Sequence, residues 1–279
     1  MKTMLHKGQF KHQALAEFVR GYEIFRFVFD KAVSPPSKYH VPRPEHSLTF
    51  YPRDAQRFSF AGATAITTYP KAVVNGIYNV PIIRYGGHDF LAIRVVFQPA
   101  AIFRLTGIPL TELANSFVDA EAIWNSKIRQ VSEQLEGNDS LEDMVSSIEL
   151  FLIQLTNSVR IKHQAIDSAS QYLLQQRGAF SLDHLADQSC LSVRQFIRNF
   201  EARIGISPKQ FARIVRFDKA YRMHNLDPLL DWFSVAIDCG YYDHQHFSKD
   251  CKNFTFLNPN AFSLLDQNAP ERHFGLHYL

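Results

Sequence analysis

The sequence predicts an α+β protein: a β-rich N-terminal half with helices towards its end, followed by an all-α C-terminal half that contains two helix-turn-helix units. Three observations support this fold class. Residue composition changes near the middle of the chain, a helical stripe of apolar residues follows that change, and the C-terminal block repeats itself after about fifty residues.

Composition first limits the class of protein. The chain has 279 residues, of which 46% are hydrophobic and 20% charged, so two domains can each bury a core. No apolar run approaches the roughly 20 residues that cross a bilayer, and the first residues lack the pattern of a signal peptide. With only three cysteines, a disulfide framework is not expected. We therefore expect a cytoplasmic protein with no membrane association.

The N-terminal half is predicted to be mostly β-structure. Residues 22–98 contain short runs of β-branched and aromatic residues, such as YEIFRFVF and FLAIRVVFQP, separated by proline and glycine. Further along, apolar residues recur at steps of three and four from Leu141 to Leu155, which predicts an amphipathic helix. Its apolar face needs a cover, either the β domain of the same chain or the same helix of a second subunit. A homodimer is therefore one of two open alternatives.

The C-terminal block contains an internal repeat. Leu182, Leu185 and Ala186 match Trp232, Val235 and Ala236 fifty residues later. One added residue then shifts the offset to fifty-one, and the pairs that follow are Phe196 with Phe247, Arg198 with Lys249, Phe200 with Cys251, Pro208 with Pro259, and Phe211 with Phe262. Each copy predicts a short helix, a tight connection, a second helix and a third element that begins with proline.

The first copy has the features of a helix-turn-helix on physical grounds. Ser181 and Ser192 are suitable N-caps for its two helices, and Gly205 is a suitable stop for the second. In that second helix one predicted stripe is apolar: Val193, Phe196, Ile197, Phe200 and Ile204. The opposite side presents Arg194, Gln195, Arg198 and Asn199. Arginine and glutamine can form paired hydrogen bonds with guanine and adenine, so this helix is a candidate reader of the major groove.

These landmarks resemble a known family. The stretch from Ile166 to about Leu265 resembles the AraC/XylS family of bacterial transcription regulators, through LADQSCLSVRQFIRNFEARIGISPKQF, then RFDKA, then VAIDCGYYDHQHFSKDCKNF. The resemblance implies two helix-turn-helix units joined by a long helix, here from Pro208 to about His224. Phe256, Cys251 and Ser263 depart from the family pattern in the second unit.

The resemblance also implies a domain organisation and a function. It divides the chain into a β-rich effector or dimerisation domain with C-terminal helices (1–158), an AraC-type DNA-binding domain (159–268) and a C-terminal tail (269–279). The implied function is a sequence-specific transcription regulator, commonly an activator. Its implied partners are double-stranded DNA, a small-molecule effector, a second subunit and, for an activator, RNA polymerase. The implied DNA-binding residues are Ser192, Arg194, Gln195, Arg198, Asn199, His244, Gln245, Ser248 and Lys249.

Four possible metal ligands stand close together in the second copy: Cys239, His244, His246 and Cys251. If residues 242–254 form a helix, the two histidines point to nearly opposite sides of it. The two cysteines are then too far apart for tetrahedral zinc, whose ligands lie within about 2.3 Å of the ion. We expect no metal and no cofactor, and we expect Cys251 to be a core residue in the place of Phe200.

Charge is distributed unevenly between the two units. Residues 192–222 contain eight basic and two acidic side chains, a balance of +6, whereas residues 223–247 contain four aspartates and no lysine or arginine. Attraction to DNA phosphates should therefore come mainly from the first unit. Over 166–268 the count is eleven basic against eleven acidic, which predicts modest affinity overall.

The ligand of the N-terminal half is not determined by the sequence. A β domain rich in phenylalanine could enclose an apolar or aromatic effector, with His40, His46, His88 and Arg94 as candidates for a polar end. The sequence leaves two alternative functions open: a protein-interaction module that uses a degenerate helix-turn-helix pair, and a cupin-like enzyme fused to a DNA-binding domain. The segment HVPRPEH holds two histidines and a glutamate, but its prolines predict a loop, so we expect no enzymatic activity.

Overall fold

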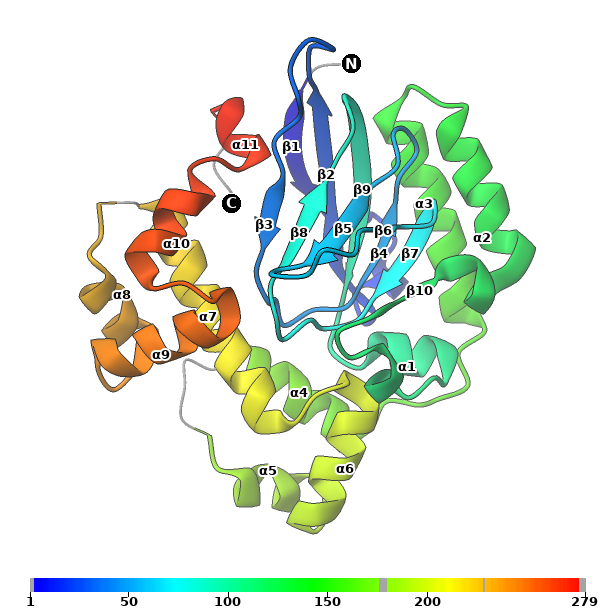
Figure 1. Cartoon of the computed structure of the whole chain (residues 1–279). Coiled ribbons are helices and arrows are strands. Elements are labelled where there is room, and N and C mark those ends of the chain that lie inside the picture. The colour runs from blue at the N-terminus through cyan, green and yellow to red at the C-terminus, as the bar shows by residue number, and fades with distance from the viewer. Residues whose placement is uncertain (1–2, 176–179, 228, 276–279) are drawn as a thin grey trace.

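The computed structural model describes residues 3–175, 180–227 and 229–275. Its N-terminal half contains two antiparallel sheets (Figure 1). The strands of the larger sheet, in spatial order, are β1 (Met4–Gly8), β2 (Val19–Val28), β9 (Asp89–Phe97), β4 (Ser47–Phe50), β7 (Ala72–Asn75) and β10 (Phe117–Asp119). Those of the smaller sheet are β3 (Lys38–His40), β8 (Ile82–Tyr85), β5 (Arg57–Phe60) and β6 (Thr67–Thr68).

Alternation along the strands gives the larger sheet two different faces. On one face Ile24, Ile93 and Val95 pack against the helices that follow the sheet. On the other face Tyr51 and Ala92 join a smaller aromatic cluster with the second sheet. The helical elements of this half are η1 (Gln13–Leu15), α1 (Ala101–Thr106), η2 (Leu110–Leu113), α2 (Ala120–Glu136) and α3 (Leu141–Asn157).

The amphipathic helix predicted from Leu141 onward is α3. Met144, Ile148 and Phe151 are buried together with α2 and the larger sheet, and α2 and α3 lie side by side along that sheet (Figure 1). The apolar stripe is therefore covered by its own chain, and a second subunit is not needed to bury it.

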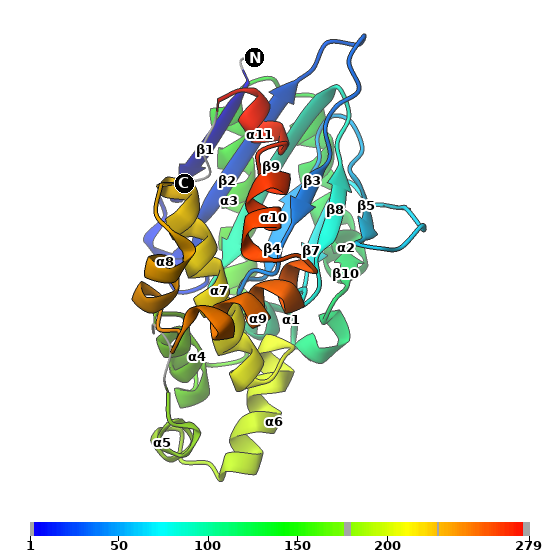
Figure 2. The ribbon, with the colours of Figure 1, turned by 60° about the vertical axis from the view of Figure 1, so that its left-hand side comes forward.

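In the part of the C-terminal half that the structure describes, all the regular elements are helices (Figure 2). Its helices are α4 (Ala165–Gln175), α5 (Leu182–Gln188), α6 (Val193–Ile204), α7 (Pro208–Leu226), α8 (Trp232–Asp238), α9 (His244–Thr255), α10 (Pro259–Asp266) and α11 (Pro270–His273). Helices α5 and α6 form the first helix-turn-helix, α8 and α9 form the second, and α7 connects them. The predicted fold class is confirmed, although α7 continues two residues past the expected end at His224.

One apolar cluster joins the two halves. Val41, Ile77 and Ala100 of the N-terminal half are buried in the same apolar cluster as α6, α7 and α9. The segment expected to be a tail also contacts the N-terminal half, since Phe274 stacks on Phe27 of β2 at 5.7 Å between ring centroids. The rest of that segment, residues 276–279, lies outside the described residues. None of the helices in the described ranges has the length and apolar composition of a transmembrane span.

Candidate nucleic-acid interface and ligand cavities

The first helix-turn-helix is fixed by its caps. The Ser181 hydroxyl accepts a hydrogen bond from the backbone N–H of His184 and so caps α5. At α6 the Ser192 hydroxyl accepts from the Gln195 backbone N–H, and the Gln195 side chain accepts from the Ser192 backbone N–H at 3.1 Å. This reciprocal capping box defines where α6 begins. Gly205, with φ of 88°, ends the helix, so the predicted caps and stop are confirmed.

Helix α6 has the two faces that the sequence predicts. Phe196, Phe200 and Ile204 are at most 1% exposed and form its inner stripe. The candidate DNA-binding residues lie on the other side: Ser192, Arg194, Gln195 and Arg198 are exposed and Asn199 is half-buried. A rigid helix with an outward arginine and glutamine surface can enter a major groove without disturbing its own packing.

The second unit repeats this construction with aspartate caps. Asp231 accepts from the backbone of Ser234 at the start of α8, and Asp243 accepts from the backbone of His246 at the start of α9. On the outer side of α9, Gln245 and Lys249 are exposed while His244 and Ser248 are half-buried. The Ser248 hydroxyl lies 3.3 Å from Nδ1 of His244, so these two polar groups are partly engaged with each other.

The possible metal ligands of the second unit are separated by the fold. Cys251 is fully buried in the core, as expected from its match to Phe200, and burial raises the pKa of its thiol to about 11. Cys239 is buried at the end of α8, and the His246 ring stands edge-on to Tyr241. Across residues 3–175, 180–227 and 229–275, no three side chains of the His, Cys, Asp or Glu type are grouped as metal ligands.

The recognition helices of the two units are not parallel in this structure. Helix α6 runs along the vertical direction in both views, whereas α9 runs across it (Figures 1 and 2). Successive major grooves on one side of a duplex repeat after about 34 Å and present the same orientation to a bound protein. In this arrangement α6 and α9 therefore cannot enter two such grooves in the same way.

The positive charge of the first unit is partly neutralised inside the protein. Arg203 of α6 forms a buried ion pair with Asp167 at 2.9 Å, and Arg213 pairs with Asp250 at 2.6 Å. Arg222 pairs with Asp218, one turn away on α7, at 2.7 Å. The balance of +6 for residues 192–222 already subtracts Asp218 but not Asp167 or Asp250, so it overstates the charge available to DNA. Arg194 and Arg198 of α6 and Lys209 of α7 are the exposed cations of this stretch.

Polar contacts connect the β domain to the second helix-turn-helix. Lys38 of β3 forms ion pairs with Asp266 of α10, at 3.0 Å, and with Glu271 of α11. Next to it, the Tyr39 hydroxyl donates to the backbone carbonyl of Thr255 at 2.8 Å, where α9 ends. The position of α9 and α10 thus depends on two consecutive residues of β3.

An aromatic cavity lies beside these contacts. Its volume is about 90 Å³, and α11 closes it through Pro270 and Glu271. Its walls include Phe25, Phe27, Phe29, Tyr51 and Phe90, and its polar side chains include Lys38, His40, Gln56, Arg84 and Arg94. Burial and nearby arginines hold the pKa of His40 well below its usual value, so its imidazole is neutral. Among the four residues suggested by the sequence, His40 and Arg94 line this cavity, whereas His46 and His88 do not.

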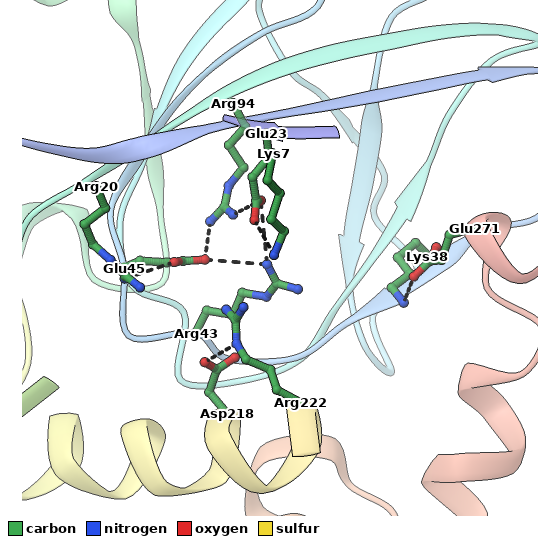
Figure 3. A network of polar contacts seen from close by, with 10 residues as sticks. All are labelled: Lys7, Arg20, Glu23, Lys38, Arg43, Glu45, Arg94, Asp218, Arg222 and Glu271. Atoms are coloured by element: carbon green, nitrogen blue, oxygen red, sulfur yellow. Dashed lines mark hydrogen bonds and ion pairs between the residues drawn. The ribbon is translucent and has the colours of Figure 1, made fainter. Parts of the chain in front are cut away.

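A network of ion pairs lies next to the cavity (Figure 3). Arg94 bridges two glutamates, with 2.8 Å to Glu23 and 2.8 Å to Glu45. The Arg43 guanidinium lies 3.5 Å from Glu45 and 3.9 Å from Glu23, and Figure 3 shows Arg43 between these glutamates and the Asp218–Arg222 pair of α7. The sequence did not predict this network, because its members come from β2, β9, α7 and the loop after β3.

Comparison with known proteins supports the C-terminal assignment. Residues 185–263 match the family model of a helix-turn-helix domain. An uncharacterized HTH-type transcriptional regulator from Haemophilus influenzae is 24% identical over 147 residues, which cover 48% of this chain and 49% of that protein. The chain thus aligns with about half the length of this curated relative. The resemblance to AraC/XylS regulators is confirmed for the C-terminal region.

Solved structures align with most of this chain at low sequence identity. An apo form of a ToxT variant from Vibrio cholerae aligns with a TM-score of 0.49 and 8% identity, covering 87% of this chain and 97% of that one. ToxT from Vibrio cholerae bound to (E)-4-(8-methylnaphthalen-1-yl)but-3-enoic acid gives a TM-score of 0.48 and 11% identity, with coverage of 88% and 98%. The AraC-like transcriptional activator CuxR gives 0.28 and 14%, with coverage of 78% and 86%.

Proposed function

Because residues 185–263 contain a helix-turn-helix domain of the AraC type, we propose that this protein is a sequence-specific DNA-binding transcription regulator. The observation that carries the proposal is α6: a capped helix with a buried apolar stripe and exposed Arg194, Gln195 and Arg198 on the opposite side. Arginine pairs best with guanine and glutamine with adenine in the major groove. No catalytic role is part of this proposal.

Within the proposal, α6 provides the main base contacts. It carries the exposed arginines, and α9 is oriented across it (Figure 2). Base or backbone contacts from the second unit, through His244, Gln245, Ser248 or Lys249, then require bent DNA or a movement of the second unit. Such a movement would break the contacts of Lys38 and Tyr39 with α9, α10 and α11.

We further propose that the aromatic cavity binds a small effector with an apolar body and an acidic group. The phenylalanine walls favour the body, and Lys38, Arg84 and Arg94 favour a negative charge. A ligand there would touch both β2 and α11, and so could shift the position of the second helix-turn-helix. It can do so only by the difference in its affinity for the two arrangements. A homodimer and RNA polymerase, if the protein activates, complete the proposed partners.

The DNA-binding proposal is tested by selecting genomic fragments with the purified chain and measuring affinity for the selected fragments by mobility shift. Arg194→Ala and Arg198→Ala should each weaken binding by about 1–3 kcal/mol, roughly 5- to 150-fold. Arg57→Ala, which removes an exposed arginine of β5 in the smaller sheet, is the matched control and should leave affinity unchanged. If no fragment is enriched, the proposal fails and the protein-interaction function is favoured.

The effector proposal has a separate test. Native mass spectrometry of protein purified from cells should detect a bound organic acid. Ala92→Leu should abolish that occupancy, because Ala92 lines the cavity and is 3% exposed, so the added carbons fill the space. Equal occupancy in the variant would show that the ligand binds elsewhere.

A further inference from the structure

A second cavity lies on the other side of the ion-pair network. Its volume is about 300 Å³, large enough for a small metabolite rather than a single water molecule. Its lining is mostly polar and comes mainly from β1 and β2, with Arg222 contributed by α7. The residues that carry the argument are Lys7, Arg20, Tyr22, Glu23, Glu45 and Arg222.

Cationic side chains gather around this cavity. Among the described residues, five of them, Lys7, Arg20, Arg43, Arg94 and Arg222, lie around three carboxylates, Glu23, Glu45 and Asp218. In a partly buried space of this kind, charges interact more strongly than they do at the surface, because water and salt screen them less.

The carboxylates are shared between several cations. Glu23 lies 2.8 Å from Arg94 and 3.2 Å from Lys7. Glu45 lies 2.8 Å from Arg94 and 3.4 Å from Arg20. Burial lowers the pKa of Lys7, and the lowering persists although Glu23 opposes it. An added anion in the cavity would therefore favour the charged form of this lysine.

The cations divide into a buried pair and an accessible trio. The side chains of Arg43 and Arg94 are 5% and 7% exposed and form the interior of the network. Those of Lys7, Arg20 and Arg222 are 31%, 34% and 27% exposed and line the cavity. Figure 3 shows Lys7, Arg20 and Arg222 approaching the network from three different directions. Such an arrangement can surround an anion and donate to it from three elements.

We propose that this cavity binds a small oxyanion with two negative charges, held by Lys7, Arg20 and Arg222. Three converging cationic donors suit a dianion better than a single charge, and guanidinium groups can donate two parallel hydrogen bonds to a phosphate or a carboxylate. The bound dianion would bridge β1 and β2 to α7, the helix that connects the two helix-turn-helix units. Its coupling to DNA binding rests on the proposed function, whereas the site itself does not.

Calorimetric titration of the full chain at constant ionic strength tests the site. Inorganic phosphate and glycerol 3-phosphate form one arm, succinate and malate form the second, and acetate and chloride are monoanion controls. Saturable heat in either dianion arm supports the site and identifies the chemical group. If no dianion binds more tightly than acetate, the proposal is refuted.

Two variants locate the binding. Arg20→Gln and Arg222→Gln each remove one charged donor and should weaken the dianion affinity about tenfold or more, since a tenfold change corresponds to about 1.4 kcal/mol. Arg57→Gln is the matched control and should bind as the wild type does. Thermal unfolding of the ligand-free variants checks that they are folded. Because both side chains are partly exposed, folded protein is expected, and unchanged affinity in both variants would overturn the assignment.

The coupling is measured separately, by DNA affinity with and without the dianion that binds. If the dianion changes the DNA affinity of the wild type but not that of Arg20→Gln, the coupling is supported. Retained dianion binding with unchanged DNA affinity refutes the coupling while leaving the site in place. A chain that binds the dianion but no DNA would refute the proposed function instead.

Discussion

Lys38 offers the sharpest test of how the two halves are held together. Its ammonium group pairs with Asp266 at 3.0 Å and with Glu271, and the three side chains are 17%, 6% and 7% exposed. Burial alone would lower the pKa of Lys38, but Tyr221, Glu271 and Asp266 together hold it above its usual value. Lys38→Met keeps most of the unbranched side chain and removes the charge. It leaves two buried carboxylates without their shared cation.

The loss of unfolding free energy expected for Lys38→Met depends on the hydrogen-bond and ion-pair partners that Asp266 and Glu271 each keep. Asp266 still accepts from the Tyr221 hydroxyl at 2.7 Å and pairs with Arg272 at 3.0 Å. Glu271 loses its ion pair with Lys38. Removing one partner from a buried ion pair costs about 3–5 kcal/mol, and the partial compensation of Asp266 favours the lower end, about 3 kcal/mol. For a chain of this size that corresponds to a fall in Tm of roughly 6–10 °C.

Thermal and urea unfolding at pH 7 measure this loss. Lys31→Met, which removes an exposed lysine from the turn after β2, is the control and should stay within about 0.5 kcal/mol of wild type. The double variant Lys38→Met/Glu271→Gln should recover part of the stability, because it removes the uncompensated carboxylate. A Lys38→Met variant as stable as the control would refute the reasoning, and the connection would then depend on apolar contacts alone.

Three further predictions concern other parts of the molecule. Arg198→Ala should weaken operator binding more than Lys249→Ala, and equal losses in titrations at fixed salt would contradict this ranking. Burial lowers the pKa of His46 to about 4, so the unfolded chain binds a proton that the folded chain excludes between about pH 6.5 and pH 4. Stability should fall by up to about 3 kcal/mol as the pH falls through that window, and His46→Gln should flatten the urea-measured slope. Gly205→Ala should destabilise the chain by about 2 kcal/mol or more, because the glycine has φ of 88° and its new Cβ would stand 2.6 Å from the Leu110 carbonyl oxygen; an unchanged Tm would contradict this.

The helix-turn-helix pair illustrates what local sequence can predict. Hydroxyl caps at Ser181 and Ser192, the stop at Gly205 and the apolar stripe of α6 depend on residues a few positions apart. Interactions of this range are fixed by helix geometry, and a repeat of fifty residues shows that the same unit occurs twice. The outward position of Arg194 and Arg198 follows from the same periodicity.

The charge available to DNA and the residues that line each cavity depend on contacts between distant parts of the chain. The sequence counts Arg203 and Arg213 as free charge for DNA, but in the folded protein each pairs with an aspartate that lies outside residues 192–222. The spacing of apolar residues from Leu141 to Leu155 likewise predicted that one face of α3 is buried. It did not predict which surface covers that face.

By itself, then, the sequence determined the order of the elements, the two helix-turn-helix units and the outward face of α6. Only the tertiary structure decided how α9 is oriented relative to α6, and which cations surround each cavity. Lys38 meets Glu271 across 233 positions of the chain, and Lys7 lines the same cavity as Arg222. No local sequence pattern predicts such contacts, because side chains far apart in sequence come together only when the sheets and helices pack.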